Sequence, residues 1–332
     1  SPEVTLEQDL IRRDLTINAM AMTPQGQLID PYNGQQDLEN KVFRHISPAF
    51  AEDPVRILRV ARFAARYKHL GFILAEETRG LMRSMVITGE VDHLVPERVW
   101  AELLKALKEQ TPTAFFYTLK ECSALEKIFP ELDRLFGVPQ PEMYHPEIDT
   151  GLHTMLCLEQ ATHLSNKPEV RFAALVHDLG KGITPKEYWP HHHGHEKSGL
   201  HILEKLCTRL RVPNSFKVLA LHVMQYHTHC HKAFELKAST LTNVLGFLGA
   251  FKNNNSLHDF LLACEADAKG RIGLENLPYP QAVLLMQANL AATSIDTSSI
   301  LNSDIKGAKI GEAIHHLRTK AVTEVINHYK QL

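Results

Sequence analysis

Histidine is the residue type whose distribution most strongly suggests chemistry. Of the 20 histidines in this 332-residue chain, 13 fall between His145 and His231. Such a concentration is typical of metal or phosphoryl chemistry more than of packing, because imidazole titrates near neutral pH and ligates metals. Within this segment an adjacent His177-Asp178 pair ends an apolar stretch and precedes Gly-Lys. A single His-Asp pair is usually structural, so its neighbours decide how it is interpreted.

A second candidate site is an arginine-rich stretch that follows Glu52-Asp53-Pro54. Acidic residues and a proline in a first turn also make an ordinary helix start. At about 100° per residue, however, four arginines share one helical face and the apolar residues occupy the other; the four are Arg56, Arg59, Arg62 and Arg66. Because no acidic residues are interleaved, we expect phosphate to be their counter-charge.

Asp53 and the first arginine of this stretch, Arg56, can also select bases. A carboxylate accepts a hydrogen bond and a guanidinium donates one, so Asp53 and Arg56 side by side match a donor next to an acceptor. Cytosine and adenine present that pair on their Watson–Crick edges, whereas uracil and guanine present the reverse. The pair therefore predicts a site that accepts C and A and rejects U and G.

Four ordered stretches resemble class II tRNA nucleotidyltransferases and bacterial poly(A) polymerases. They are Arg12 to Met20, Asp30 to Gly34 with Asp37-Leu38, Glu52 to Phe63, and Pro96 to Trp100. One match alone would be weak, but four in order over about a hundred residues are specific. The resemblance implies that Glu52 to Phe63 is the amino-acid template for the incoming base. It implies nucleotide binding by Arg13, Asp14, Asn18, Asp53, Arg56, Arg59 and Arg62.

Other parts of that family pattern are missing from the sequence. The family's head domain carries a Gly-Ser phosphate-binding turn and a D-x-D pair that holds two metal ions, both before the R-R-D motif. Asp9 and Asp14 do not have D-x-D spacing. We therefore expect the chain to begin partway through the head domain, and by itself to bind nucleotide weakly and transfer nothing.

The surroundings of the His-Asp pair resemble the HD superfamily. The resemblance implies an H…HD…D metal set composed of His153, His177, Asp178 and Asp267. It assigns the catalytic work to His177, Asp178 and Lys181, with Lys181 neutralising a phosphate, and makes His195 and His227 candidates for further ligands or a general acid. A divalent cation held by such residues activates water and screens phosphoryl charge. We expect the remaining crowded histidines to be surface or loop residues; they are His191, His192, His193, His229 and His231.

A class II neck followed by an HD domain resembles the bacterial multifunctional CCA protein family. This resemblance implies addition of CCA to the tRNA 3′ end from CTP and ATP, together with 2′,3′-cyclic phosphodiesterase, 2′-nucleotidase and phosphatase activities. It implies Mg²⁺ for nucleotidyl transfer and Mg²⁺, Ni²⁺ or another transition metal in the HD domain. The expected partners are the tRNA 3′ end, ATP and CTP, and a homodimer is a further possibility.

Three alternatives differ in class from this interpretation. A poly(A) polymerase-like enzyme shares the first motifs but would continue into a basic tail without HD ligands. A phosphohydrolase alone would not need the arginine face with Asp53 and Arg56. An RNA-binding scaffold with a degenerate metal site would not keep the full set of HD residues.

The elements that must position these residues are predominantly helical. We predict a mainly α fold in four parts, with a short β remnant of a nucleotidyltransferase head at 1–46 and a helical neck and body at 47–140. A helical HD domain at 141–275 and a helical tRNA-binding tail at 276–332 complete it. Within these we expect strands at 15–23, up to Ile29 and at 41–46, helices at 55–67, 97–108 and 114–125, and a linker at 139–146.

Composition limits the partners and the compartment. A net charge of −2 argues against nonspecific coating of nucleic acid, so RNA must meet local basic patches. No apolar run approaches the roughly 20 residues of a membrane-spanning helix. The five cysteines form no C-x-x-C pair and predict neither a zinc knuckle nor a disulfide framework. We therefore expect a cytoplasmic protein without a membrane partner.

Overall fold

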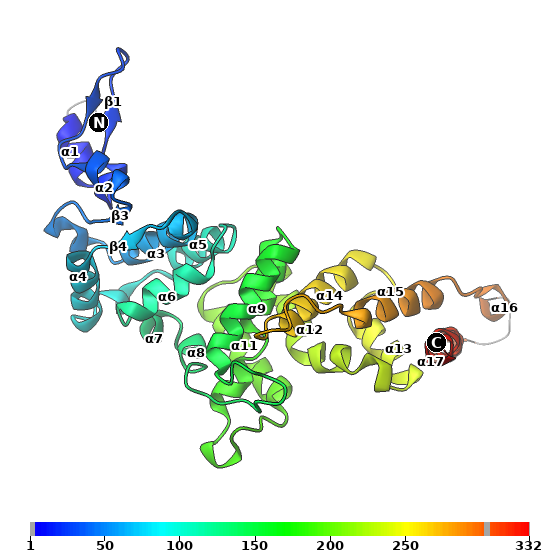
Figure 1. Ribbon diagram of the computed structural model, residues 1–332. Helices are drawn as coiled ribbons and strands as arrows, with labels where there is room; N and C mark the ends of the chain where they lie inside the picture. The colour runs from blue at the N-terminus through cyan, green and yellow to red at the C-terminus, as the bar shows by residue number, and fades with distance from the viewer. Residues whose placement is uncertain (1–3, 302–305, 332) are drawn as a thin grey trace.

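The N-terminal segment and the C-terminal helices lie at opposite ends of an elongated, mainly helical molecule (Figure 1). The computed structural model describes residues 4–301 and 306–331. Strands are few and two residues long within these ranges, which confirms the predicted mainly α class. None of the helices in the described ranges has both the length and the apolar character needed to cross a membrane.

The N-terminal segment contains α1 (Leu6–Ile11), α2 (Gly34–Glu39) and a small hairpin. In the hairpin β1 (Ala21–Met22) pairs antiparallel with β2 (Leu28–Ile29) around a turn that contains Pro24-Gln25-Gly26. The strand predicted at 15–23 is mostly wrong, because Thr16–Asn18 forms a 3-10 turn, η1. This turn packs against α2.

A second two-stranded pair joins the N-terminal segment to the neck. β3 (Val42–Phe43) lies within the strand predicted at 41–46 and runs parallel to β4 (Ile73–Leu74), a partner that the sequence did not indicate. The physical reason is burial, since the Phe43 ring stacks on Phe72 at a centroid distance of 5.0 Å. An isolated bridge between Leu15 and His45 and an ion pair between Arg44 and Asp37 link this strand to the preceding segment.

The neck is built around α3, whose bounds Val55–Tyr67 match the predicted helix. Its apolar face, including Ile57, Leu58 and Ala61, is buried against α5 (Pro96–Leu107) and α6 (Thr113–Glu121). The other neck elements are η2 (Pro48–Glu52), η3 (Lys68–Leu70), α4 (Glu76–Ile87), η4 (Glu90–His93), α7 (Leu125–Ile128) and α8 (Pro130–Asp133).

The middle of the molecule is a bundle of long helices. α9 (Thr150–Leu164), α10 (Pro168–Val176), α12 (Asn214–His231) and α14 (Asn254–Lys269) pack side by side. α11 (His195–Arg209) covers the turn that follows α10. That turn and the next are the 3-10 segments η5 (Leu179–Ile183) and η6 (Lys186–Tyr188).

The C-terminal part is a smaller helical layer. α17 (Ala308–Gln331) packs on α13 (Ala238–Phe247) and α15 (Pro280–Thr293). Val322 and Ile326 are its buried residues. The remaining elements are η7 (Ala233–Glu235) and α16 (Ser298–Leu301).

Candidate metal centre and nucleotide-selecting helix

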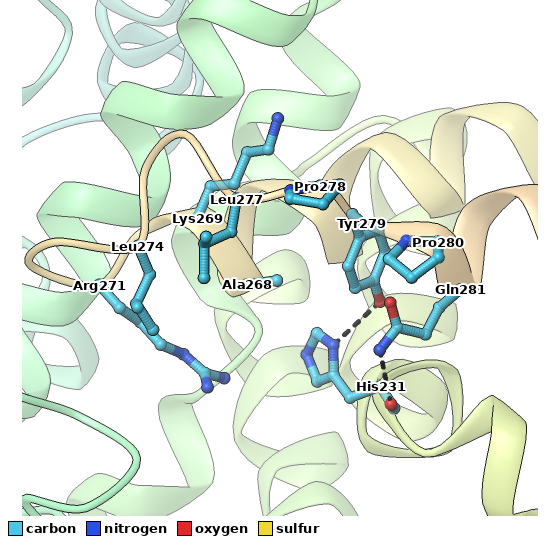
Figure 2. A pocket seen from close by; sticks show the side chains of 10 residues that line it. All are labelled: His231, Ala268, Lys269, Arg271, Leu274, Leu277, Pro278, Tyr279, Pro280 and Gln281. Atoms are coloured by element: carbon cyan, nitrogen blue, oxygen red, sulfur yellow. Dashed lines mark hydrogen bonds between the residues drawn. The ribbon is translucent and has the colours of Figure 1, made fainter.

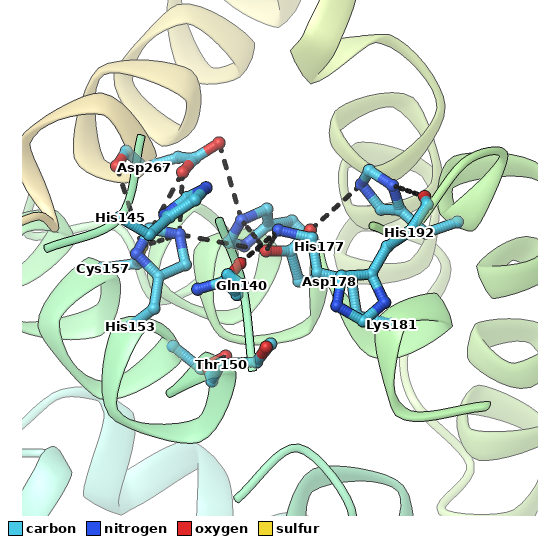
Figure 3. Close-up of polar contacts among 12 residues, drawn as sticks. Gln140, His145, Thr150, His153, Cys157, His177, Asp178, Lys181, His192 and Asp267 are labelled. Carbon is cyan, nitrogen blue, oxygen red and sulfur yellow. Dashed lines mark hydrogen bonds and ion pairs between the residues drawn. The ribbon is translucent and has the colours of Figure 1, made fainter. Parts of the chain in front are cut away.

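The structure brings the four predicted HD residues together from three helices (Figure 3). His153 lies on α9, His177 and Asp178 follow α10, and Asp267 lies on α14. His153 Nε2 is 3.0 Å from Asp267 Oδ1, and His177 Nε2 is 3.2 Å from Asp178 Oδ2. His177 Nε2 is also 3.5 Å from Asp267 Oδ2. All four side chains are buried, so the centre lies inside the bundle.

The two candidate additional histidines reach the same centre from the other side. His195 begins α11 and places its Nε2 3.2 Å from Asp178 Oδ1. His227, near the end of α12, places its Nε2 3.7 Å from the same oxygen. Asp178 therefore lies between these imidazoles and the His153 side of the cluster.

Backbone carbonyls orient four imidazoles in the same way. A carbonyl oxygen only accepts, so each of these histidines must carry its proton on Nδ1 and direct Nε2 inward. The four Nδ1–O distances run from 2.7 to 2.9 Å, and the pairs are His153 with Gly270, His177 with Ala174, His195 with His192, and His227 with Val223. Fixing Nδ1–H on a backbone group is how proteins prepare Nε2 as a metal ligand.

Buried polar atoms without hydrogen-bond partners mark where a cation would fit. His177 Nε2 and both carboxylate oxygens of Asp178 are buried and make no hydrogen bond within the described residues, although Lys181 Nζ forms an ion pair with Asp178 Oδ2. Ligand atoms of His153, Cys157, His177 and Asp267 lie within 4.8 Å of one another, as do those of His177, Asp178 and His227. Burying such groups unpaired is costly, and a divalent cation would satisfy them. The residues present therefore fit a metal.

The charges of the centre compensate one another. Burial raises the pKa of Asp178, but His177 and Lys181 outweigh burial and hold that pKa well below its usual value. Burial lowers the pKa of His177, but Asp178 and Asp267 outweigh burial and raise it well above its usual value. Both carboxylates are thus ionised and require positive charge beside them. Burial, with the neighbouring charge on His177, lowers the pKa of His227 to about 3.

Two glycines allow the helices to approach closely enough to form the centre. A Cβ on Gly180 would lie 2.0 Å from the carbonyl oxygen of His195, where the η5 turn meets α11. A Cβ on Gly270 would lie 2.6 Å from Cys157 Sγ, where α14 ends against α9. Any side chain at these positions would push His195 or Asp267 away from its partners.

The segment 139–148 supplies residues that the sequence analysis missed. It is not the free linker predicted from its three prolines, because Gln140, His145 and Glu147 are buried. Glu147 Oε1 lies 3.0 Å from His153 Nδ1 and 3.0 Å from His145 Nδ1. Lys181 Nζ donates to Gln140 Oε1 at 2.6 Å and pairs with Asp178 Oδ2 at 2.7 Å. The sequence carried no local signal for this, since the polar residues His145 and Glu147 are buried while the apolar Ile148 is exposed.

Two histidines predicted to be surface or loop residues belong to this network instead. His231 Nε2 lies 2.6 Å from Asp267 Oδ2, because His231 follows His227 by one helical turn on α12. His192 is buried, and its Nε2 donates to the carbonyl oxygen of Pro139 at 2.8 Å. The prediction holds for His191 and His193, which are exposed, while His229 is half-buried.

The predicted template pair is not a pair in this structure. Asp53 Oδ2 is bound by Arg98 at 2.8 Å, and Asp53 Oδ1 accepts the backbone N–H of Val55 at 3.1 Å. Arg56 donates instead to the carbonyl oxygens of Ala49 and Arg12, at 2.9 and 2.8 Å. Asp53 and Arg56 lie three residues apart at the start of α3, but each has another partner.

The arginine face of α3 also has protein counter-charges, contrary to the prediction of phosphate alone. Arg59 Nε donates to Asp14 Oδ2 at 2.7 Å, and Arg62 Nε donates to Glu102 Oε2 at 2.7 Å. The acids come from other elements, which is why the helix sequence shows none interleaved. Of the other predicted nucleotide-binding residues, Arg13 pairs with Asp9 at 3.0 Å and Asn18 Oδ1 accepts the backbone N–H of Leu15 at 3.1 Å.

Fold and site together define a helical nucleotidyltransferase neck joined to an HD-type metal centre. Family models agree with this order along the chain. Poly A polymerase head domain matches residues 1–44, Probable RNA and SrmB-binding site of polymerase A matches 71–136, and HD domain matches 150–249.

Similar proteins narrow the class further. The Multifunctional CCA protein of Teredinibacter turnerae is 58% identical over 319 residues, covering 96% of this chain and 78% of the relative. That of Methylococcus capsulatus is 58% identical over 323 residues, covering 97% and 76%. The chain therefore belongs to the multifunctional CCA protein family, whose members are CCA-adding tRNA nucleotidyltransferases with an HD phosphohydrolase domain.

Solved structures share the fold. A CCA-adding enzyme in complex with ATP aligns over 97% of this chain and 70% of its own length, with a TM-score of 0.64 at 20% identity. The Thermotoga maritima CCA-adding enzyme complexed with tRNA aligns over 98% and 75%, with a TM-score of 0.59 at 20% identity.

Proposed function

We propose that the HD centre of this chain hydrolyses 2′,3′-cyclic phosphodiesters and 2′-phosphomonoesters with a divalent cation. The observation that supports this most directly is the convergence of four imidazole Nε2 atoms on two buried carboxylates, each imidazole fixed through Nδ1 by a backbone carbonyl. His153, His177, Asp178 and Asp267 would hold the cation, with His195 and His227 as additional ligands. Mg²⁺, Ni²⁺ or another transition metal suits such mixed nitrogen and oxygen donors.

The residues around the cation have distinct tasks. When bound, the cation supplies Lewis acidity toward the phosphate and lowers the pKa of water. Lys181 balances the charge of Asp178 and holds its carboxylate in place. Gln140 in turn accepts a hydrogen bond from Lys181 and fixes the position of its ammonium group. Burial lowers the pKa of His227 to about 3, so its imidazole is neutral at pH 7 and its Nε2 is available to ligate the cation.

We further propose that the neck selects the incoming nucleotide and holds the tRNA 3′ end. Asp53 and Arg56 would form the template once Arg98 and the backbone acceptors release them, and Mg²⁺ would serve nucleotidyl transfer in the head domain. The substrates would be CTP and ATP. The homodimer and the cytoplasmic location stay predictions; light scattering of the purified chain tests the first.

Hydrolysis by the purified chain tests the HD proposal. We expect cleavage of adenosine 2′,3′-cyclic phosphate and adenosine 2′-phosphate with a divalent cation, and none with a chelator. His177→Ala and Asp178→Asn should abolish both reactions, whereas His193→Ala, at an exposed position, should not. In a chain joined to a complete head domain, nucleotide addition should survive the same substitutions. Full hydrolysis by either variant, or none by the unsubstituted chain, would reject the proposal.

A further inference from the structure

A pocket of about 280 Å³ is lined by His231 and by Ala268, the residue that follows the candidate metal ligand Asp267 in sequence (Figure 2). It is bounded by the ends of α12 and α14 and by the segment that leads into α15. The residues that line it are His231, Ala268, Lys269, Arg271, Leu274, Leu277, Pro278, Tyr279, Pro280 and Gln281. The proposed hydrolase assigns no task to this pocket.

His231 connects the pocket wall to the metal centre. Its Nε2 lies 2.6 Å from Asp267 Oδ2 and its Nδ1 lies 2.9 Å from the hydroxyl oxygen of Tyr279. The Gln281 amide donates to the carbonyl oxygen of His231 at 3.1 Å. This wall is therefore fixed at three points, and a molecule in the pocket would lie one side chain away from a ligand of the cation.

The charge of the pocket favours an anion. Three of its lining residues are basic and, among the described residues that line it, none is acidic. Lys269 is paired with Glu265 at 2.8 Å, one helical turn earlier. Arg271 has only a distant ion pair, 3.9 Å from Asp267 Oδ1, within the parts of the chain that the structure describes.

Arg271 has unused capacity to bind. Its Nε is buried without a hydrogen-bond partner. Asp267 does not satisfy it, because Asp267 Oδ1 lies 3.9 Å from Arg271 Nη2, beyond hydrogen-bond distance, while the Asp267 oxygens face His153 at 3.0 Å and His231 at 2.6 Å. A guanidinium that is half-enclosed and incompletely paired is suited to phosphate, which it binds through two parallel hydrogen bonds.

The opposite side of the pocket is apolar. Leu274, Leu277, Pro278 and the ring of Tyr279 form it, and Leu277 is exposed although it is a large aliphatic residue. The volume is close to the lower limit for small-molecule sites. A compact ligand with one anionic and one flat, weakly polar end matches this surface.

We propose that this pocket is the substrate-binding subsite of the hydrolase and that it binds a ribonucleoside with a phosphate on its 2′ oxygen. Arg271 contacts the phosphate, and the nucleoside lies against Leu274, Leu277 and Tyr279. This inference rests on the proposed phosphohydrolase function, because the pocket adjoins the metal centre through His231, whose Nε2 lies 2.6 Å from Asp267 Oδ2.

Binding of adenosine 2′-phosphate to the full chain, measured by calorimetry with a chelator present so that the ligand is not hydrolysed, tests the subsite. Arg271→Gln should raise the dissociation constant roughly ten- to hundredfold, the usual effect of losing a hydrogen bond to a charged group. The dissociation constant of Arg271→Lys should lie between those of the unsubstituted chain and Arg271→Gln, since lysine keeps the charge but not the paired N–H donors of the guanidinium. Arg209→Gln removes the same charge from the Glu131 pair elsewhere and should change nothing. Metal content should be equal in all four proteins.

Further measurements distinguish the nucleoside contacts of the pocket from its phosphate contacts, and an RNA end from a free nucleotide as the ligand. Leu277→Ser should weaken adenosine 2′-phosphate several-fold and leave inhibition by inorganic phosphate unchanged. In hydrolysis, Arg271→Gln should raise KM far more than it lowers kcat. If the substrate is an RNA end, Arg271→Gln should also raise the KM for a short RNA that ends in a 2′,3′-cyclic phosphate. If Arg271→Gln raises the KM for the mononucleotide alone, the subsite binds free nucleotides.

The outcomes distinguish this inference from the function on which it rests. If the unsubstituted chain hydrolyses its substrates and Arg271→Gln leaves both the dissociation constant and KM unchanged, the subsite is wrong and the hydrolase stands. If the unsubstituted chain shows no metal-dependent hydrolysis, the proposed function fails first. If circular dichroism shows that Arg271→Gln does not fold, the dissociation constant and KM of Arg271→Lys decide whether the subsite is correct.

Discussion

At the scale of single residues, Glu147 is the most informative addition to the HD set. Its carboxylate lies 3.0 Å from His153 Nδ1, on the side of the imidazole away from the metal position. A carboxylate there fixes the tautomer and raises the basicity of Nε2. Glu147 is buried, and its pKa is lowered by His145 and His153 against the effect of burial, so it is ionised at neutral pH.

We therefore expect Glu147→Gln to weaken divalent-metal binding roughly ten- to hundredfold. Glu142→Gln is the matched control, because Glu142 is exposed in the same segment and the substitution removes the same charge. The measurement is competition for the cation with a fluorescent chelator. Equal metal affinity in the two variants would mean that Glu147 only packs.

The template prediction also belongs to single residues. In a chain joined to a complete head domain, Asp53→Ala or Arg56→Ala should relax the preference for C and A over U and G, by about 1–3 kcal/mol of discrimination per lost hydrogen bond. Arg134→Ala, an exposed arginine in the neck, should not. Steady-state incorporation of the four nucleotides measures this. Unchanged nucleotide preference in both template variants would mean that Asp53 has only a structural role, in its ion pair with Arg98.

The sequence identified most of the HD centre but not all of it. The His177-Asp178 pair, His153 and Asp267 stand in motifs, so their convergence was predictable. His231 and Glu147 could not be assigned in the same way, since their roles depend on which side of α12 and of the 139–148 segment faces the bundle. Prolines in that segment suggested a linker, whereas contacts of Pro139 with His192, Gln140 with Lys181 and Glu147 with His153 hold it in the site.

At the scale of elements, α3 shows which predictions a sequence supports. Its bounds followed from the spacing of apolar residues and from the Asp-Pro start, both of which are local. The partners of its arginines were not predictable, because Asp14 and Glu102 lie 45 and 40 residues away in sequence. The parallel pairing of β3 with β4 was missed for the same reason, since two-residue strands have almost no periodic signal.

The Arg62–Glu102 pair joins α3 to α5 and predicts a pH dependence. Burial raises the pKa of Glu102, but Lys105 and Arg62 outweigh burial and lower it below the usual 4.5. A carboxyl with a depressed folded-state pKa stabilises the fold above about pH 4.5, and this stabilisation is lost as pH falls through the folded-state pKa. Glu102→Gln should therefore cost stability at pH 7 and progressively less toward pH 4.

Urea unfolding at several pH values measures that difference. We expect the free-energy gap between the unsubstituted chain and Glu102→Gln to be about 1–3 kcal/mol at pH 7, the cost of an unsatisfied buried charge partner. Glu126→Gln removes a charge from an exposed position and should show a small gap at every pH. A gap for Glu102→Gln that stays constant down to pH 4 would contradict the argument.

At the scale of the whole molecule, the neck and the HD bundle share one apolar core. Trp100 of α5 packs edge-on against Phe172 of α10 and Phe216 of α12, at centroid distances of 5.5 and 4.9 Å. Arg171 is buried and donates to the carbonyl oxygens of Leu107 and Glu109 at the end of α5, at 2.8 and 3.2 Å. The buried cluster is continuous from the neck into the C-terminal helices.

A shared core means that metal binding in the bundle should stabilise the neck as well. A ligand at a hundred times its dissociation constant adds about 2.7 kcal/mol to the folded state. The chain has two tryptophans, so Trp189→Phe leaves Trp100 as the reporter of the junction. We expect the thermal transition of Trp100 fluorescence in that variant to move up by several degrees with saturating divalent cation and back with a chelator.

The control and the opposing result are both clear in this experiment. Adding Asp178→Asn to Trp189→Phe removes a proposed metal ligand, so the Trp100 transition should no longer respond to the cation. Far-ultraviolet circular dichroism follows all the helices, and in a cooperative molecule its transition coincides with that of Trp100. If the cation shifts only the dichroism and leaves the Trp100 transition in place, the neck unfolds independently of the HD bundle, and the aromatic contact of Trp100 with Phe172 and Phe216 does not couple them.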